Sequence, residues 1–389
     1  MNGIYMDSNA TTPTDPRVVE AMLPYFDREF GNPSSAYSLA QKARAAMESA
    51  RVVTGRALGC PPDAVVFTSG GSESDNIAIK GAALARMPDR GHIITTRIEH
   101  HAVLTTCEYL ERHLGFGVTY LPVDGSGLVD PADVERACRP DTFLISVMLA
   151  NNEVGTIEPV AEIAAIARKR GILVHTDAVQ AVGKIPVDVA ALGVDLLALS
   201  GHKLYGPKGV GALYVRPGTR IHPLSHGGRH ERGLRAGTEN VPGIVGLGRA
   251  IELCLEEIGE EPARLRALVD RLEHGIVERV PDVVVNGRAA ARLPGTLNVS
   301  FLYVEGESVV LALDMEGISV STGSACTTDA VEPSHVLTAM GVQPNVAQGS
   351  VRMSLGRHNS DSDVDRVLEV VPGVVERLRS LSPLARRGC

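Results

Sequence analysis

Residues Val194 to Gly211 read VDLLALSGHKLYGPKGVG. The stretch begins as a short apolar run and ends abruptly in the polar sequence SGHK, residues 200–203. A continuous apolar run of this length is typical of a strand that is buried on both faces of a parallel sheet. Open α/β sheets hold their ligands at the carboxyl ends of such strands. The stretch therefore predicts an α/β fold with a ligand site near Lys203.

Lys203 is expected at the mouth of this buried strand, where an ammonium group is costly. A buried amine loses its proton easily and becomes a nucleophile toward carbonyl groups. Most lysines at a strand end simply extend into water. Here Ser200 and His202 supply donors beside the amine, and glycines at positions 206, 209 and 211 let a ligand approach closely. We infer that Lys203 forms a Schiff base with pyridoxal phosphate (PLP).

Composition narrows the class of protein. The chain has 389 residues, which predicts two domains. Its formal net charge is -8 with no long block of like charge, so nucleic-acid binding has no electrostatic support. The start, MNGIYMDSNATT, lacks a secretory pattern, and no apolar run approaches about 20 residues, so we expect no membrane span. The six cysteines are scattered without zinc-site spacing. These features predict a reduced, soluble, cytoplasmic protein.

Strand and helix patterns alternate from residue 65 onward. Strands are expected at 65–68, 93–95, 118–121, 143–148, 173–176, 196–199 and 212–215. Helices are expected at 15–27, 38–58, 73–84, 102–113, 132–137, 160–170 and 187–192. The alternation predicts a mainly parallel seven-stranded sheet in a large PLP-binding α/β domain, residues 15–260. A short glycine-rich link precedes the last strand and cannot make a parallel crossover, so that strand is expected to be antiparallel.

Residues 1–14 and 261–389 are expected to form a smaller α+β domain. Its strands are expected at 283–285, 296–301 and 351–354, and its helices at 308–315, 333–340 and 362–381, after a long helical region at 244–279 that contains the domain change. Pro372 and Gly373 are expected to break or kink the last helix, because proline cannot donate the helical hydrogen bond.

The sequence FTSGGSESDN, residues 67–76, predicts a strand, a glycine turn and a helix start. Ser72 is expected to cap the helix, with Asp75 three residues on as a variant of the capping box. The N–H groups and the dipole of a helix N-terminus bind anions such as phosphate. An ordinary joint between strand and helix is the alternative. The pattern matches neither GxGxxG nor the Walker sequence, so a dinucleotide or ATP is not favoured.

Further polar residues follow other strand ends. Asp177 can hold a pyridinium N–H and keep the ring cationic, although a helix cap is the alternative. Gln180 can reach the ring hydroxyl. His100 or His101 can stack on a ring or shuttle protons, although most lone histidines are structural. The sequence LANNEVG, which contains Asn152, follows a fourth strand. Because all these groups follow the carboxyl ends of strands, we expect them on one edge of the sheet.

Two further residues stand out in the C-terminal part. Cys326 lies among small and polar residues in SVSTGSACTTD, residues 319–329, which predicts a mobile loop with a reactive thiol rather than a buried structural cysteine. Arg352 lies inside a short strand pattern, where a charged side chain needs a partner. A guanidinium fork fits a substrate carboxylate, and a structural ion pair is the alternative.

Together these motifs resemble the cysteine desulfurases, in particular the nitrogen-fixation type (NifS) and its housekeeping relative (IscS). The resemblance covers nearly the whole chain, including DSNATT, TSGGSESDN, EHHAV, NNEVGTIEP, SGHKLYGPKGVGALYV, GGRHERGLRAGTEN, STGSACTTD and SVRMSLGR. It implies a homodimeric, cytoplasmic PLP enzyme of fold type I that takes sulfur from L-cysteine and leaves L-alanine. It also implies delivery to a NifU- or IscU-like scaffold for iron–sulfur cluster assembly. The sequence GGRHERGLRAGTENV and the end LSPLARRGC favour the NifU-like partner and a role in nitrogen fixation.

The resemblance also assigns residues to the cofactor. The phosphate would be held by Gly71, Ser72, Ser200, His202 and, from the partner subunit, Thr238. The ring and its substituents would be contacted by His100, Asn152, Asp177, Gln180 and Lys203. Ser72 replaces the threonine usual in the family, which keeps the hydroxyl group.

The remaining implied roles concern substrate and sulfur. Arg352 and Asn152 would bind the substrate, Lys203 and His100 would move protons, and Cys326 would receive the sulfur as a persulfide. No metal is expected at the PLP site, although Cys326 would contact a nascent iron–sulfur cluster transiently. Asp329 puts a negative charge near the thiol, which departs from the family pattern. A selenocysteine lyase or another PLP β-lyase remains an alternative, as does a PLP-fold protein that acts as an assembly platform.

Overall fold

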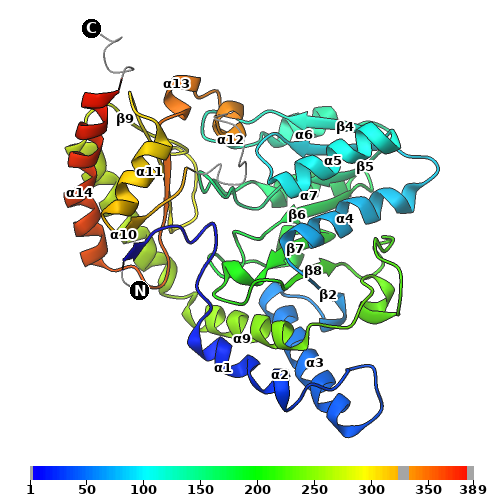
Figure 1. The fold of residues 1–389 in the computed structure, drawn as a ribbon. Helices are drawn as coiled ribbons and strands as arrows, with labels where there is room; N and C mark the ends of the chain where they lie inside the picture. Colours follow the sequence, from blue (N-terminus) through cyan, green and yellow to red (C-terminus); the bar gives the residue numbers. More distant parts are fainter. Residues whose placement is uncertain (1–2, 323–332, 383–389) are drawn as a thin grey trace.

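The computed structural model describes residues 3–322 and 333–382. Its largest feature is a seven-stranded sheet in the order β2-β8-β7-β6-β5-β3-β4 (Figure 1). The strands are β2 (Val65–Thr68), β3 (His92–Thr96), β4 (Gly117–Leu121), β5 (Thr142–Ser146), β6 (Leu173–Asp177), β7 (Leu196–Ser200) and β8 (Gly211–Val215). Only β8 runs antiparallel to its neighbours in this sheet. The mainly parallel α/β fold and the antiparallel last strand are confirmed.

Helices cover both faces of this sheet. They are α1 (Pro16–Met22), α2 (Pro24–Asp27), α3 (Ser38–Leu58), α4 (Gly71–Arg86), α5 (His101–Leu114), α6 (Pro131–Ala137), α7 (Val160–Arg168), α8 (Val189–Leu192) and α9 (Val241–Glu257). Successive side chains along a strand point to opposite faces. In β7, Leu196 packs in a buried cluster with α4 and α5, whereas Leu197 packs in another with α3, α7 and α9. This double cover explains why β7 is apolar along its length.

A second group of elements includes α10, α11, α14 and β9, which lie to one side of the large sheet (Figure 1), while residues of α12 pack against Ile98 and Met148 near that sheet. Its antiparallel sheet has the order β12-β10-β9, and β1 pairs in parallel with β11. The elements are β1 (Ile4–Tyr5), β9 (Val283–Val285), β10 (Thr296–Phe301), β11 (Ile318–Ser319), β12 (Ser350–Ser354), α10 (Glu261–Arg279), α11 (Gly306–Met315), α12 (His335–Ala339), α13 (Pro344–Ala347) and α14 (Asp361–Leu381). One buried cluster joins Met6 to apolar residues between 265 and 375. The domain boundary between residues 260 and 261 stays a prediction.

No helix in the described ranges is both long and apolar enough to cross a membrane. The long helical region expected at 244–279 consists of two helices, α9 and α10, which residues 258–260 separate.

A break at Pro372 is wrong, because α14 runs through this residue as one helix, whereas a kink there stays a prediction. Proline lacks the N–H that would donate to the carbonyl group four residues earlier, which belongs to Leu368. In the structure Arg279 Nη1, from α10, donates to the Leu368 oxygen at 3.1 Å. A side chain from a neighbouring helix thus replaces the missing backbone donor, and the helix continues.

The role of Arg279 as the donor to the Leu368 oxygen can be tested. We expect Arg279→Ala to lower the free energy of unfolding by about 1 kcal/mol, because it leaves the Leu368 carbonyl group without its donor. In a Pro372→Ala background the backbone N–H returns, so the same change should cost less. Urea unfolding of the four proteins in this double-mutant cycle gives the coupling. Equal losses in both backgrounds would contradict the role of Arg279.

Candidate active site

The polar groups that follow the parallel strands meet around one cavity of ≈ 390 Å³. Ten of the twelve residues predicted for the site line it: Gly71, Ser72, His100, Asn152, Asp177, Gln180, Ser200, His202, Lys203 and Arg352. Of the other two, Thr238 lies exposed in the loop before α9, and Cys326 lies outside the described residues. The topology thus brings together side chains that are far apart in the sequence, as expected for the carboxyl edge of a parallel sheet.

Lys203 lies in the short helical turn that follows β7 directly. Its Nζ donates to the backbone oxygens of Asn9 and Ala10, both at 2.6 Å. Thr12, also in the N-terminal segment, is bound to this turn through its N–H, which donates to the His202 oxygen at 2.9 Å. The N-terminal segment therefore closes one side of the cavity and holds the lysine amine at its wall.

Asp177 is the last residue of β6 and is buried. Its Oδ1 accepts from the Val179 N–H at 2.9 Å, while Oδ2 has no hydrogen-bond partner in residues 3–322 and 333–382. Asp177 caps none of the described helices, so the alternative of a helix cap does not hold. Burial raises the pKa of this carboxyl group, and the charges of His100 and Lys203 oppose the rise. The remaining oxygen can accept a pyridinium N–H, which would supply the missing counter-charge.

His100 is the N-cap of α5, and its Nδ1 accepts from the Ala102 N–H at 3.1 Å. An acceptor nitrogen carries no proton, so the neutral imidazole has its proton on Nε2. Burial lowers the pKa of His100, Asp177 opposes the effect, and Lys203 and neighbouring histidines add to it. His101 instead is exposed on α5 and packs against the His335 ring at 4.8 Å between centroids. Of the two candidates, His100 is the residue that lines the cavity.

The expected capping box at Ser72 is wrong. The helix begins at Gly71, with Gly70 as N-cap and no side-chain cap, and Glu73 accepts the Ser69 N–H instead. Gly70 has φ 151°, a backbone conformation that favours glycine. Asp75 points into the protein rather than back to the helix start. The first N–H groups of α4 therefore remain available for an anion beside the cavity.

These donors fit PLP. A phosphate group would meet the N-terminus of the 16-residue helix α4, together with Ser200 and His202. A pyridinium N–H would meet Asp177, and an aldehyde would meet the Lys203 amine. One cavity thus offers donors for an anion, a carboxylate for a cation and an amine for an electrophile. PLP carries all three groups, whereas a simpler ligand would use only some of these side chains.

Sequence reasoning missed Asp7 as a partner of Arg352. The Arg352 guanidinium is buried, with Nη2 on Asp7 Oδ1 at 2.7 Å and Nη1 on the Asn152 oxygen at 3.0 Å. Its Nε is buried without a hydrogen-bond partner in the part of the chain that the structure describes. The structural ion pair considered for Arg352 therefore exists, and it orients the side chain at the cavity wall. Asp7 is the first residue of the motif DSNATT, and this motif is the sequence signal that could have identified it.

A second missed residue is Asp75, which lines the cavity and is 1% exposed. Its Oδ1 lies 3.4 Å from His175 Nε2, and His175 Nδ1 lies 2.8 Å from Ser146 Oγ. Burial and then the charge of Asp177 raise the pKa of Asp75. A protonated Asp75 beside Asp177 avoids two adjacent buried negative charges.

Comparison with known proteins identifies the family. The aminotransferase class-V model matches residues 4–367. The chain is 53% identical to "Cysteine desulfurase IscS" of Dictyoglomus turgidum over 98% of this chain and 96% of the relative, and 55% identical to the protein of the same name from Methanosarcina thermophila over 98% and 94%. A solved structure named "NIFS-LIKE PROTEIN" is 42% identical and superposes with a TM-score of 0.91 over 97% of this chain and 100% of that one.

The chain belongs to the cysteine desulfurases of aminotransferase class V. The desulfurase is PLP-dependent, as its family is, and the fold and cofactor expected from the sequence are confirmed. A second solved relative, titled "SspA in complex with cysteine", is 42% identical with a TM-score of 0.81 over 90% of this chain and 98% of that one. Within residues 3–322 and 333–382, the desulfurase has no cluster of three or more histidine, cysteine or acidic side chains arranged to hold a metal ion.

Glu99 is a buried acid next to His100 in the desulfurase. Its Oε1 accepts from Thr96 Oγ1 at 2.8 Å and from the Met148 N–H at 2.9 Å, while Oε2 is buried without a described partner. Burial raises the pKa of Glu99 to about 8. The folded state thus binds this proton more tightly than the unfolded chain. Its stabilising contribution is present in full below the unfolded pKa and is lost as the pH rises through about 8.

Glu99→Gln should remove this pH dependence, because glutamine stays neutral. We expect the variant to gain stability relative to the parent between about pH 5 and about pH 9, as the parent's carboxyl group loses its proton. Urea unfolding across this range measures the difference. Glu278→Gln, at an exposed position of α10, is the matched control and should show no such trend. A difference for Glu99→Gln that does not change with pH would contradict a neutral buried Glu99.

Proposed function

We propose that this desulfurase transfers the sulfur of L-cysteine to Cys326, with Lys203 as the residue that binds PLP. The observation that supports this most is the convergence of Lys203, Asp177 and the N-terminus of α4 on one cavity. When bound, PLP supplies an electron sink for bond breaking next to the amino-acid α carbon. The residues of the chain provide the proton transfers, the orientation of the substrate and the sulfur acceptor.

Proton movements in the proposal belong to Lys203 and His100. The Lys203 amine, which the Asn9 and Ala10 carbonyl groups hold at the cavity wall, takes the α proton of the substrate. In the neutral imidazole of His100, Nδ1 already accepts from the Ala102 N–H. Only the Nε2–H group is left to interact with a ligand, and it can only donate. The neutral imidazole can therefore donate a hydrogen bond from Nε2 to the substrate, and His100 transfers a proton only from the imidazolium form, which the charge of Asp177 favours.

Arg352 and Asn152 form the proposed site for the substrate carboxylate. Arg352 is oriented by Asp7 and by the Asn152 backbone oxygen, and its buried Nε lacks a described partner. A carboxylate that accepts from this guanidinium would satisfy that donor through charge-assisted hydrogen bonds.

The described residues on either side of the segment that carries Cys326 bond to residues that line the cavity or are adjacent in sequence to lining residues. Before it, Ser321 and Arg352 exchange backbone hydrogen bonds at 3.1 and 2.6 Å. After it, Ser334 Oγ donates to Glu153 Oε2 at 2.5 Å, and His335 Nε2 lies 3.0 Å from the Glu99 oxygen. These anchors support a segment that begins and ends within reach of the substrate.

The proposed sulfur transfer balances without an external oxidant or reductant. The thiolate of Cys326 attacks the sulfur of the substrate, the bond between that sulfur and the β carbon breaks, and its electron pair stays with the carbon fragment. A proton then completes L-alanine, and Cys326 is left as a persulfide. Substrate cysteine plus enzyme thiol thus equals alanine plus enzyme persulfide.

The partners belong to the same proposal. We propose a homodimer, supported by five large apolar side chains that are exposed together in residues 19–37: Val19, Leu23, Phe26, Phe30 and Tyr37. Exposed Thr238 would then reach the partner's phosphate site. A NifU- or IscU-like scaffold would accept the sulfur in the cytoplasm. The motif GGRHERGLRAGTENV, residues 227–241, supports the NifU-like branch and a role in nitrogen fixation.

Cys326→Ala tests the sulfur acceptor. We expect the variant to keep the absorption band of the bound cofactor and its change on addition of L-cysteine, but to form almost no alanine, because the nucleophile is missing. Alanine release and labelling of persulfides in the same samples measure this. Cys138→Ala, whose half-buried thiol lies at the end of α6, is the control and should turn over normally. Normal turnover by Cys326→Ala would refute the role and favour a lyase.

A further inference from the structure

Lys184 is a lysine beside the active site that the proposed mechanism does not use. It lies four residues after Gln180, and its Nζ donates to Gln180 Oε1 at 2.6 Å and to Asn9 Oδ1 at 2.9 Å. It makes no ion pair with any carboxylate of residues 3–322 and 333–382. Burying an ammonium group without an acidic partner costs free energy, and here only the two neutral amides offset that cost. The contact with these amides is therefore the feature to explain.

The contact with Lys184 decides how both amides are oriented. A lysine ammonium group has donors only, so the amide atoms that face it must be oxygens. The NH₂ group of Asn9 consequently points the other way, to Thr296 Oγ1 at 2.9 Å and the Asn152 oxygen at 3.2 Å. The NH₂ group of Gln180 points to the backbone oxygen of Asn9 at 2.9 Å. Both amide orientations thus agree with the partners on each side, a donor at the oxygen and an acceptor at the NH₂ group.

This orientation does not depend on the charge of Lys184. Burial and the charges of Lys203 and Arg352 lower the pKa of Lys184 to about 7, and Cys254 opposes the shift. A neutral amine still has two hydrogens for the oxygens of Asn9 and Gln180, and the backbone oxygens of Asn152 and Asn9 still require the NH₂ groups on the other side. The amides therefore keep their orientation on both sides of this pKa.

Gln180 presents a donor to the cavity as a result. One hydrogen of its NH₂ group is used by the Asn9 oxygen, and the second is left for a ligand of the cavity that Gln180 lines. In the proposed function this ligand atom is the ring oxygen of PLP. A flipped amide would place Oε1 against that electron-rich oxygen, which is repulsive.

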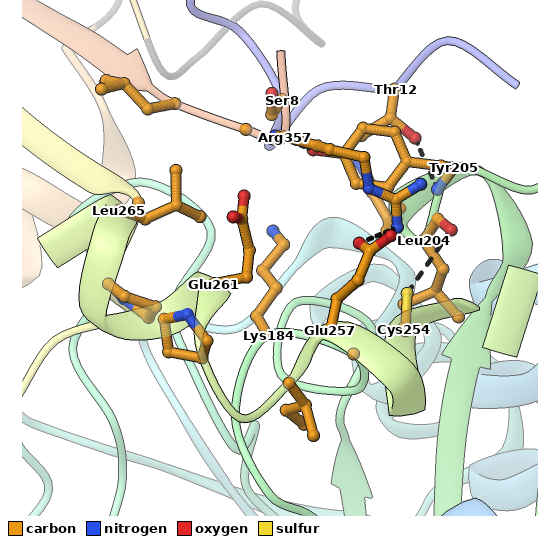
Figure 2. A pocket seen from close by; sticks show the side chains of 18 of the residues that line it. Ser8, Thr12, Lys184, Leu204, Tyr205, Cys254, Glu257, Glu261, Leu265 and Arg357 are labelled. Carbon is orange, nitrogen blue, oxygen red and sulfur yellow. Dashed lines mark hydrogen bonds and ion pairs between the residues drawn. The ribbon is translucent and has the colours of Figure 1, made fainter. Parts of the chain in front are cut away.

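On its other side Lys184 borders a second, smaller cavity of ≈ 40 Å³. Figure 2 shows the Lys184 side chain reaching into this cavity, with Cys254 and Glu257 of α9 and Glu261 of α10 around it. Asn9 and Lys203 line both cavities. The space behind Lys184 is large enough for a longer side chain or a water molecule, so substitutions at this position need not disturb the core.

We propose that Lys184 is a positioning residue that orients the Gln180 amide so that its NH₂ group donates to the ring oxygen of PLP. The proposal rests on the proposed function, because it assumes that the ring oxygen faces Gln180. Lys184 itself touches neither the cofactor nor the substrate in this scheme. Its effect passes through Gln180, whose Oε1 accepts from Lys184 and whose NH₂ group donates to the Asn9 backbone oxygen.

The spectral titration of the holoenzyme tests this without reference to turnover. A donor on the ring oxygen lowers the proton affinity of the neighbouring imine nitrogen, so Lys184→Met should raise the pKa of the cofactor band by about one unit. It should also weaken retention of PLP about five- to tenfold in dialysis. Lys184→Arg supplies donors only and should restore both values. Lys169→Met, at an exposed position after α7, is the matched control and should change neither.

Gln180→Leu separates orientation from a simple effect of charge. If Lys184 acts through Gln180, Lys184→Met should add almost nothing in the Gln180→Leu background. Additive shifts would overturn the proposal, because they would mean that Lys184 acts on the cofactor directly through its charge. So would a shift in Gln180→Leu without one in Lys184→Met, and this result would leave the proposed function standing. If Gln180→Leu shifts nothing, Gln180 does not meet the ring oxygen and the proposal fails with that assignment. Absence of any cofactor band in the parent protein would instead refute the proposed function.

Discussion

A lysine amine at the end of a strand that is buried on both faces is the constraint on which the rest of the structure depends. The strand places Lys203 at the edge of the sheet, but the sheet alone cannot satisfy its donors. Two backbone oxygens of the N-terminal segment do so, across 194 and 193 residues of sequence. This contact explains why the segment DSNATT, which has almost no secondary structure of its own, packs into the centre of the molecule.

Charges around the cavity are arranged by sign. Buried acids gather near His100, where Asp177, Asp75 and Glu99 influence one another's pKa values. The Lys184 amine and the Arg352 guanidinium border the cavity or its neighbour and are held by amides, a backbone oxygen and Asp7. PLP carries a cationic ring nitrogen and anionic oxygens. A site with separated charges can therefore bind it in one orientation, because the reverse orientation would place like charges together.

Much of the fold could be predicted because local signals were strong. Helix α3 has the expected bounds since Gly59 ends it in a left-handed conformation, φ 69°. The length of the link before β8 correctly predicted an antiparallel strand. The grouping of polar residues at strand ends follows from sheet topology, and it brought ten of the candidate residues to one cavity.

What could not be predicted depends on contacts between distant residues. Asp7 meets Arg352 across 345 positions, and no local pattern records that pairing. Asp75 looks like a capping residue in sequence but is buried beside His175, because packing of α4 on the sheet decides its direction. Pro372 stays inside a helix because Arg279 of another helix supplies a donor. Lys184 did not stand out in the sequence, because its partner Asn9 is 175 residues away.

The central claim is that Lys203, and no other lysine, binds the cofactor. Reduction of the holoenzyme with borohydride followed by peptide mass spectrometry places the pyridoxyl group directly. The account predicts the adduct on Lys203 alone. The most informative contradiction would be an adduct on Lys184. Burial lowers the pKa of this lysine to about 7, and its Nζ donates to Asn9, the residue whose backbone oxygen also accepts from Lys203. An adduct there, on any other lysine, or on none would refute the account.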